Sequence, residues 1–150
     1  MSKLNLLLLA SLAACSTMPP AATAPATSMT APASSMAAPT GTYVATVVAS
    51  DIPASAPADL QSGMVGAWQL VFDAPGHALV RYNGEQVVDA PFTVQGNHIT
   101  FGDDSGSYAC HDTAHYTWQM TAAGLVFTKL DDACEGRMLV LTRHPWTKQP

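Results

Sequence analysis

The feature that most constrains the fold is a series of short alternating segments, separated by turn sequences, in residues 41–150. In one segment Trp68, Leu70 and Phe72 alternate with smaller or polar residues, as expected for a strand buried on one face. Asn83-Gly84 is a strong hairpin signal, because both central positions of a type I′ turn need a positive φ. This spacing predicts an all-β domain of about eight or nine antiparallel strands, without a long amphipathic helix.

The predicted strands follow one another at hairpin spacing, and a sheet of this size tends to close because closure removes exposed edges. We therefore predict an up-and-down β-barrel with an apolar interior, although a two-sheet sandwich would satisfy the same alternation. Residues 51–62 contain two prolines and predict a loop with at most one helical turn. The predicted strands cover residues 42–48, 66–72, 79–82, 85–89, 92–94, 98–101, 116–120, 125–129 and 138–142.

The large apolar side chains fall mostly on one face of these strands, which would be the barrel interior. Such an interior could hold a small apolar or amphipathic ligand by burial, with one or two polar groups fixing its orientation. The same side chains could instead fill a small barrel completely. The candidate ligand-binding residues are Leu70, Phe72, Leu79, Phe92, Ile99, Phe101, Tyr116, Trp118 and Phe127.

The N-terminal segment has the pattern of an export signal. Lys3 supplies a positive charge, residues 4–12 are largely apolar, and Leu12-Ala13-Ala14-Cys15 resembles the lipobox of bacterial lipoproteins. The apolar run is too short for a transmembrane helix, which needs about 20 residues. The resemblance implies a lipoprotein signal peptide at residues 1–14 and attachment of acyl chains, palmitate among them, to Cys15. An ordinary secretory signal is the alternative interpretation.

Residues 15–40 are predicted to be a lipid-anchored linker between the membrane and the domain. They are rich in alanine, serine and threonine, contain five prolines and carry no charged residue, a composition that favours extended and solvated chain. The implied location is the cell envelope. Ser16 follows the cysteine, where an aspartate would mark retention in the inner membrane, so we expect the outer membrane and its periplasmic face.

The cysteine count adds a prediction about the folded domain. If Cys15 is acylated, Cys110 and Cys134 remain as a pair, and an oxidising compartment favours a disulfide between them. The alternative is that Cys110-His111-Asp112, together with His115, binds a metal such as zinc. An oxidised sulfur supplies no thiolate, so we predict the disulfide and neither a metal nor a cofactor.

Charge and motifs argue against nucleic acid and against catalysis. Eleven acidic residues face six Lys and Arg, for a net charge of −5, and the basic residues do not cluster. The chain contains no Gly-x-Ser-x-Gly sequence and no serine with an identifiable base, so we assign no catalytic residue and predict that the protein is not an enzyme. The acidic pairs at residues 103–104 and 131–132 fall in predicted turns, where aspartate is common.

Gly66-Ala67-Trp68, at the start of a predicted strand, is similar to the Gly-x-Trp signature of lipocalins. Arg143 or Arg137 could match the arginine that closes the barrel in that family. The resemblance implies a lipocalin-like domain at residues 41–150, in which Arg143 stacks on Trp68 at one end of the barrel. The chain departs from typical lipocalins in that its sequence shows no evident C-terminal helix. Further segments that carry the resemblance are residues 41–43, 83–85, 116–118, 131–137 and 141–146.

Two functions are compatible with these observations. The first is a membrane-anchored, non-catalytic lipocalin-like protein that binds a small apolar or amphipathic ligand in the barrel. The alternative is a protein-interaction module of the cell envelope, an inhibitor or assembly factor, with a solid barrel core. Its candidate surface would be residues 103–115 and 131–136, joined by the predicted disulfide. A cavity inside the barrel would favour the first function, and its absence the second.

Overall fold

The computed structural model describes residues 37–150. The predicted signal peptide, Cys15 and nearly all of the predicted linker lie outside the described residues. Within 37–150, none of the helices has the length and apolar character that crossing a membrane would require.

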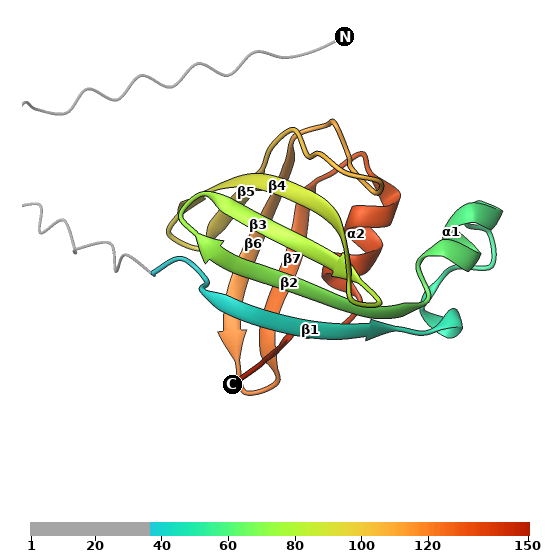
Figure 1. The fold of residues 1–150 in the computed structure, drawn as a ribbon, viewed down its shortest axis with the longest axis horizontal. Helices are drawn as coiled ribbons and strands as arrows, with labels where there is room; N and C mark the ends of the chain where they lie inside the picture. The colour runs from blue at the N-terminus through green and yellow to red at the C-terminus, as the bar shows by residue number, and fades with distance from the viewer. Residues whose placement is uncertain (1–36) are drawn as a thin grey trace, which may run out of the picture. The chain divides into compact units, whose positions relative to one another are not determined.

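Eight antiparallel strands form one sheet in the order β7-β6-β5-β4-β3-β2-β1-β8. Figure 1 labels the strands from β1 to β7. From β1 to β7 each strand pairs with its neighbour in the sequence, so the predicted up-and-down arrangement is confirmed. The strands are β1 (Gly41–Val47), β2 (Gly66–Ala74), β3 (His77–Tyr82), β4 (Glu85–Gln95), β5 (His98–Phe101), β6 (Ala114–Thr121), β7 (Gly124–Asp131) and β8 (Thr147–Lys148).

The C-terminal segment nearly closes this sheet into a barrel. β8 pairs with β1, and the backbones of Leu125 in β7 and Trp146 exchange two hydrogen bonds of 2.9 and 2.8 Å. Gly124 allows this approach, because its φ is +126° and a Cβ there would lie 2.3 Å from the carbonyl oxygen of Trp146. Both outer strands of the meander, β1 and β7, are therefore covered by the same short segment.

The last predicted strand, residues 138–142, is wrong. These residues belong to the helix α2 (Glu135–Thr142), in which Leu139, Val140 and Leu141 are all buried. A short run of apolar residues fits a buried strand as well as a buried helix, so periodicity could not separate the two. The predicted absence of a C-terminal helix is wrong for the same reason, and the closing strand is β8.

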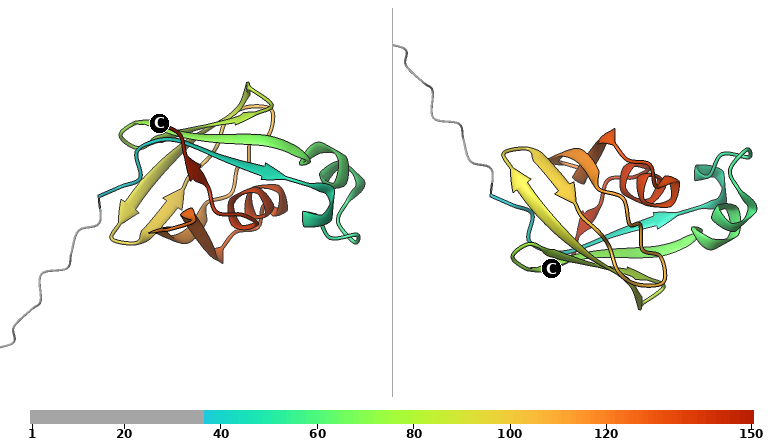
Figure 2. Two further views of the ribbon diagram at one scale, coloured as in Figure 1. Left: turned by 90° about the horizontal axis from the view of Figure 1, so that it is seen from below. Right: turned by 90° about the horizontal axis from the view of Figure 1, so that it is seen from above.

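Two further helical segments lie between β1 and β2, where the sequence predicted a loop with at most one turn. They are the 3₁₀ turn η1 (Ala49–Asp51) and the short helix α1 (Ala58–Gly63). In all the views of Figures 1 and 2, α1 and α2 lie toward the same end of the barrel. The two helices therefore border the barrel interior from that end.

β4 combines two predicted strands, residues 85–89 and 92–94, into a single strand that passes through Pro91. It pairs with β3 up to Pro91 and with β5 from Phe92 onward. Pro91 therefore lies where pairing passes from one neighbour to the other. At this corner the missing N–H donor of proline is tolerated.

Leu79 lies on the outer face of β3, so its predicted inward orientation is wrong. The register pairs Leu70 with Val80 and Val71 with Leu79 across β2 and β3. Because paired residues share a face, Val80 points inward beside the buried Leu70. Ala78, Leu79 and Val80 are all apolar, and in such a run the size of the side chain does not reveal the face.

Candidate ligand-binding cavity

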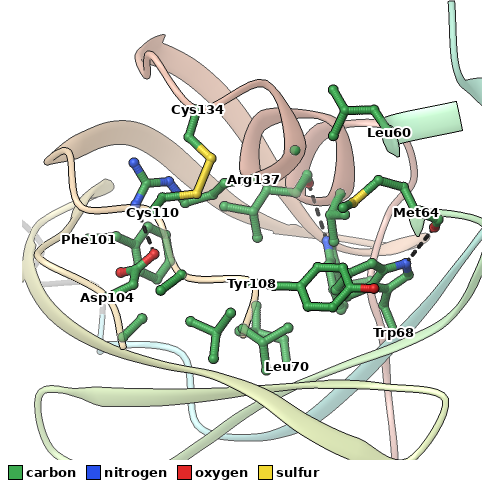
Figure 3. A pocket seen from close by; sticks show the side chains of 18 of the residues that line it. Leu60, Met64, Trp68, Leu70, Phe101, Asp104, Tyr108, Cys110, Cys134 and Arg137 are labelled. Atoms are coloured by element: carbon green, nitrogen blue, oxygen red, sulfur yellow. Dashed lines mark hydrogen bonds and ion pairs between the residues drawn. A yellow bond between two sulfur atoms is a disulfide. The ribbon is translucent and has the colours of Figure 1, made fainter. Parts of the chain in front are cut away.

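A partly enclosed cavity of about 320 Å³ lies between the barrel interior and the two helices, as Figure 3 shows. Leu70, Phe101 and Trp146 line its buried side, and Val140 and Leu141 of α2 border it. A cavity of about 150 Å³ is sufficient to bind benzene in a protein core, so this space accommodates a larger molecule. The other lining residues are Asp59, Leu60, Met64, Trp68, Val80, Val88, Ala90, Asp104, Tyr108, Ala109, Cys110, Cys134, Gly136 and Arg137.

Trp68 is held rigidly in the wall of this cavity. Its indole Nε1 donates a hydrogen bond of 2.9 Å to the carbonyl of Met64, and its ring packs against the rings of Tyr82 and Tyr108. The hydroxyl of Tyr82 donates to the carbonyl of Val65 at 2.6 Å. These contacts tie the chain between α1 and β2 to the barrel and place Met64 and Trp68 side by side at the cavity.

The predicted stacking of Arg143 on Trp68 is wrong. Arg143 is the exposed C-cap residue of α2, whereas Trp68 is buried against two tyrosines. The helical path of residues 135–142 causes this difference, since the prediction assumed that a strand carried Arg143 to the barrel end. The buried arginine of this segment is Arg137, in the first turn of α2, and it contributes to the cavity wall.

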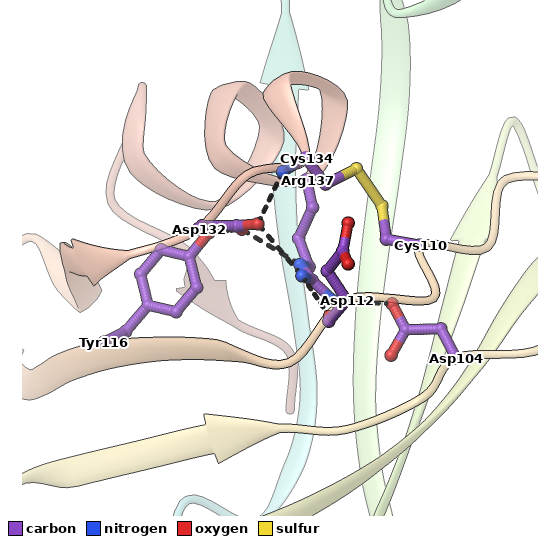
Figure 4. Close-up of a disulfide and its surroundings, with 7 residues drawn as sticks. All are labelled: Asp104, Cys110, Asp112, Tyr116, Asp132, Cys134 and Arg137. Atoms are coloured by element: carbon purple, nitrogen blue, oxygen red, sulfur yellow. Dashed lines mark hydrogen bonds and ion pairs between the residues drawn. A yellow bond between two sulfur atoms is a disulfide. The ribbon is translucent and has the colours of Figure 1, made fainter.

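Cys110 and Cys134 form a disulfide, which confirms the predicted bond (Figure 4). It connects the loop between β5 and β6 to the residue that precedes α2, and both cysteines line the cavity.

The bonded sulfur of Cys110 cannot serve as a thiolate ligand. Within residues 37–150, no group of three or more His, Cys, Asp or Glu side chains is arranged to hold a metal ion. The bond joins residues 103–115 to residues 131–136, the two parts of the predicted interaction surface, and both parts contribute residues to the cavity wall.

A buried charged cluster centred on Arg137 lies beside the disulfide (Figure 4). The guanidinium Nη1 donates to Asp104 Oδ2 at 3.0 Å, while Nε and Nη2 donate to the two carboxylate oxygens of Asp132 at 2.9 Å each. Nη2 also donates to the backbone carbonyl of Asp112 at 2.7 Å. The hydroxyl of Tyr116 donates to Asp132 Oδ2. The cluster thus joins β6, α2 and the two loops that the disulfide connects.

Environment separates the pKa values of the two carboxyl groups in this cluster. Burial raises the pKa of Asp104 above its usual value, and the nearby Arg137 only partly offsets this effect. Burial acts on Asp132 as well, but the hydrogen bonds from Arg137 and Tyr116 outweigh it and hold the pKa of Asp132 below its usual value. Burial, followed by the interaction with Asp132, raises the pKa of the Tyr116 hydroxyl. Asp132 is therefore the firmly ionised partner of Arg137.

Asp104 also carries a polar atom that the rest of the described chain does not satisfy. Its side chain is 3% exposed, and among residues 37–150 its Oδ1 has no hydrogen-bond partner. An unsatisfied buried acceptor costs about 1–3 kcal/mol. Because Asp104 lines the cavity, it is the residue there whose polar group most needs a partner.

Eight of the nine predicted ligand-binding residues are buried, but only Leu70 and Phe101 line this cavity. Tyr116 belongs to the charged cluster, and Leu79 points outward. Trp118 lies in another pocket, beside Tyr43 and residues 37–40. The other four pack as core side chains in and around the aromatic cluster; they are Phe72, Phe92, Ile99 and Phe127.

Several residues of the cavity come from segments that have no strand periodicity. Met64 follows α1, Asp104 and Tyr108 lie between β5 and β6, and Arg137 lies in α2. Alternation marks the inward face of a strand and carries no information about these loops and helices. The predicted disulfide was the one sequence signal that placed two of these segments together.

Comparison with known proteins assigns the chain to no family. No protein-family model matches it, and neither a curated protein nor a solved structure matches it significantly. The resemblances to lipoproteins and lipocalins therefore rest on the residues that carry them and stay predictions. The barrel, the disulfide and the cavity are described by the structure directly.

Proposed function

We propose that this protein is a non-catalytic, lipocalin-like barrel that binds a small apolar or amphipathic molecule in the cavity below α2. The observation that carries the proposal is the cavity itself, about 320 Å³ in volume and walled largely by apolar side chains. Burying an apolar ligand against such walls contributes about 25 cal/mol per Å² of surface removed from water. A space of this size between the barrel interior and the helices favours ligand binding over an interaction module with a solid core.

The three tryptophans allow a direct test, since Trp68 and Trp146 line the cavity and Trp118 does not. We expect decanol to give a saturable change in the tryptophan fluorescence of the full chain. Trp68→Phe should remove much of this change, while Trp118→Phe should retain it. The proposal fails if the folded protein gives no saturable response to any medium-chain amphiphile.

A second variant tests the location without using fluorescence of the altered residue. Val140→Phe places a larger side chain on the cavity side of α2, and we expect it to weaken binding about tenfold, equal to 1.4 kcal/mol. Val126→Phe makes the same change on the partly exposed face of β7 and should leave the affinity unchanged. Equal effects of the two variants would place the ligand elsewhere.

We also propose that the protein is anchored to the cell envelope, at the periplasmic face of the outer membrane, by acyl chains on Cys15. The support is the sequence Leu12-Ala13-Ala14-Cys15 behind an apolar run. Mass spectrometry of the protein purified from bacterial membranes should find Cys15 as the acylated N-terminal residue. Cys15→Ser should carry no acyl chain, and a mature wild-type chain that begins at another residue without lipid contradicts the proposal.

A further inference from the structure

The buried cluster beside the cavity holds one cation and two carboxyl groups. The side chains of Arg137, Asp104 and Asp132 are 8%, 3% and 0% exposed. With both carboxyl groups ionised, the cluster carries an excess negative charge in a region that water reaches poorly. Buried charges are stable when they are paired and hydrogen-bonded. The cluster therefore lacks either a proton or a second positive charge.

This excess negative charge falls on Asp104. Both oxygens of Asp132 accept hydrogen bonds, Oδ1 from the Cys134 backbone and Arg137, and Oδ2 from Arg137 and Tyr116. Asp104 uses Oδ2 for Arg137, and in the described structure nothing donates to its Oδ1. Of these two carboxyl groups, only that of Asp104 lines the cavity. Burial also raises the pKa of Asp104, as expected for a carboxylate with too few partners.

Arg137 lines the same cavity, but it is poorly suited to receive an anionic ligand. A guanidinium group has five N–H donors, and four hydrogen bonds within the protein already engage Nε, Nη1 and both N–H groups of Nη2. One N–H donor of the guanidinium remains free of these bonds. Arg137 therefore cannot donate the two parallel hydrogen bonds with which arginine binds a carboxylate. A ligand carboxylate would also be repelled by Asp104.

We infer that the cavity selects amphiphiles whose polar end donates hydrogen bonds, an ammonium group above all, and that Asp104 is the residue that receives this end. The inference rests on the proposed function and specifies the chemical class of its ligand. An ammonium group supplies the missing positive charge and a donor to Asp104 Oδ1. A hydroxyl group supplies only the donor, and a carboxylate supplies neither.

Three amphiphiles that share one alkyl chain provide the test: decylamine, decanol and decanoate. We expect the full chain, with Cys15→Ser to prevent acylation, to bind decylamine tightest and decanoate weakest in isothermal titration at neutral pH. The difference between decylamine and decanoate should be at least tenfold, which is about 1.4 kcal/mol. Asp104→Asn should remove most of the preference for decylamine over decanol. Asp73→Asn is the matched control, because Asp73 is an exposed carboxylate that does not line the cavity.

A measurement on the chain with native Asp104 covers the case in which Asp104→Asn does not fold. The carboxyl ¹³C resonance of Asp104 should shift as decylamine binds, while that of Asp132, which does not line the cavity, should shift far less. Equal affinities for the three amphiphiles, tightest binding of decanoate, or an unmoved Asp104 resonance would overturn the inference and leave the proposed function standing. The absence of saturable binding by all three would instead overturn the proposed function.

Discussion

Replacing Arg137 with methionine should lower the free energy of unfolding by about 3–5 kcal/mol, the cost of breaking a buried ion pair by removing one partner. The substitution keeps much of the volume of the side chain but leaves Asp132 and Asp104 without their cation. It also removes the hydrogen bond to the carbonyl of Asp112, which ties the loop before β6 to α2. Urea denaturation of the oxidised protein measures the loss.

Arg143 provides the matched control for this change, because it is exposed at the end of the same helix. Arg143→Met should alter the free energy of unfolding by no more than about 0.5 kcal/mol. If the two arginine variants lose the same stability, Arg137 does not hold the cluster together in the way described.

The pH dependence of stability gives the Arg137 variant a second signature. The lowered pKa of Asp132 contributes stability that is present above its unfolded value of about 3.9 and is lost as the pH falls through its folded value. The raised pKa of Asp104 has the opposite sign: its contribution is present below about 3.9 and is lost as the pH rises through its folded value. Without Arg137 the contribution of Asp132 disappears, so Arg137→Met should be relatively more stable in acid than at neutral pH.

Removing the disulfide should lower the free energy of unfolding by about 3 kcal/mol, which is also a large effect. Cys110 and Cys134 are 24 residues apart. A cross-link that closes a loop of this length lowers the conformational entropy of the unfolded chain, which stabilises the folded state by about 3 kcal/mol. The double variant Cys110→Ala, Cys134→Ala should unfold at a lower urea concentration than the oxidised wild type. Because both cysteines line the cavity, the variant should also bind decylamine more weakly.

The control for the disulfide experiment is the addition of reductant to both proteins. Dithiothreitol should lower the urea midpoint of the wild type toward that of the double variant and leave the double variant unchanged. An unchanged midpoint of the fully reduced wild type would contradict a stabilising role of the bond.

The barrel could be predicted from the sequence because its strands repeat one local pattern. Inward side chains such as Trp68, Leu70 and Phe72 alternate with outward neighbours, and Asn83-Gly84 fixes a tight turn, so the strands and the short hairpins are encoded within a few residues. The prediction that Leu79 points inward was wrong, because three consecutive apolar residues at this point hide the alternation between inward and outward positions. The pairing of Leu70 with Val80 decides the face there, and that pairing depends on the neighbouring strand.

The cavity could not be predicted in the same way, because tertiary contacts create it. Residues 138–142 read equally well as strand and as helix, and their packing over the barrel interior decides between the two. Asp104 and Asp132 fall in segments where aspartate usually faces water. Only the fold shows that Arg137, from a different segment, turns them into a buried cluster. The cysteine count was informative because a disulfide links distant segments through chemistry that the sequence displays.

Closure of the barrel by the segment after β7 has a consequence for the order in which the protein folds. From β1 to β7 each strand pairs with its neighbour in the sequence, whereas the seam pairs Tyr43 with Lys148 across almost the whole domain. Pairing between residues far apart in the sequence forms slowly, because the entropy of closing the long loop is lost before the stabilising contacts are made. The same late segment supplies α2 and Cys134 to the cavity wall. Without this segment β1 and β7 would be open edges prone to aggregation. We therefore expect the binding site and the protection of the sheet to form together, late in folding.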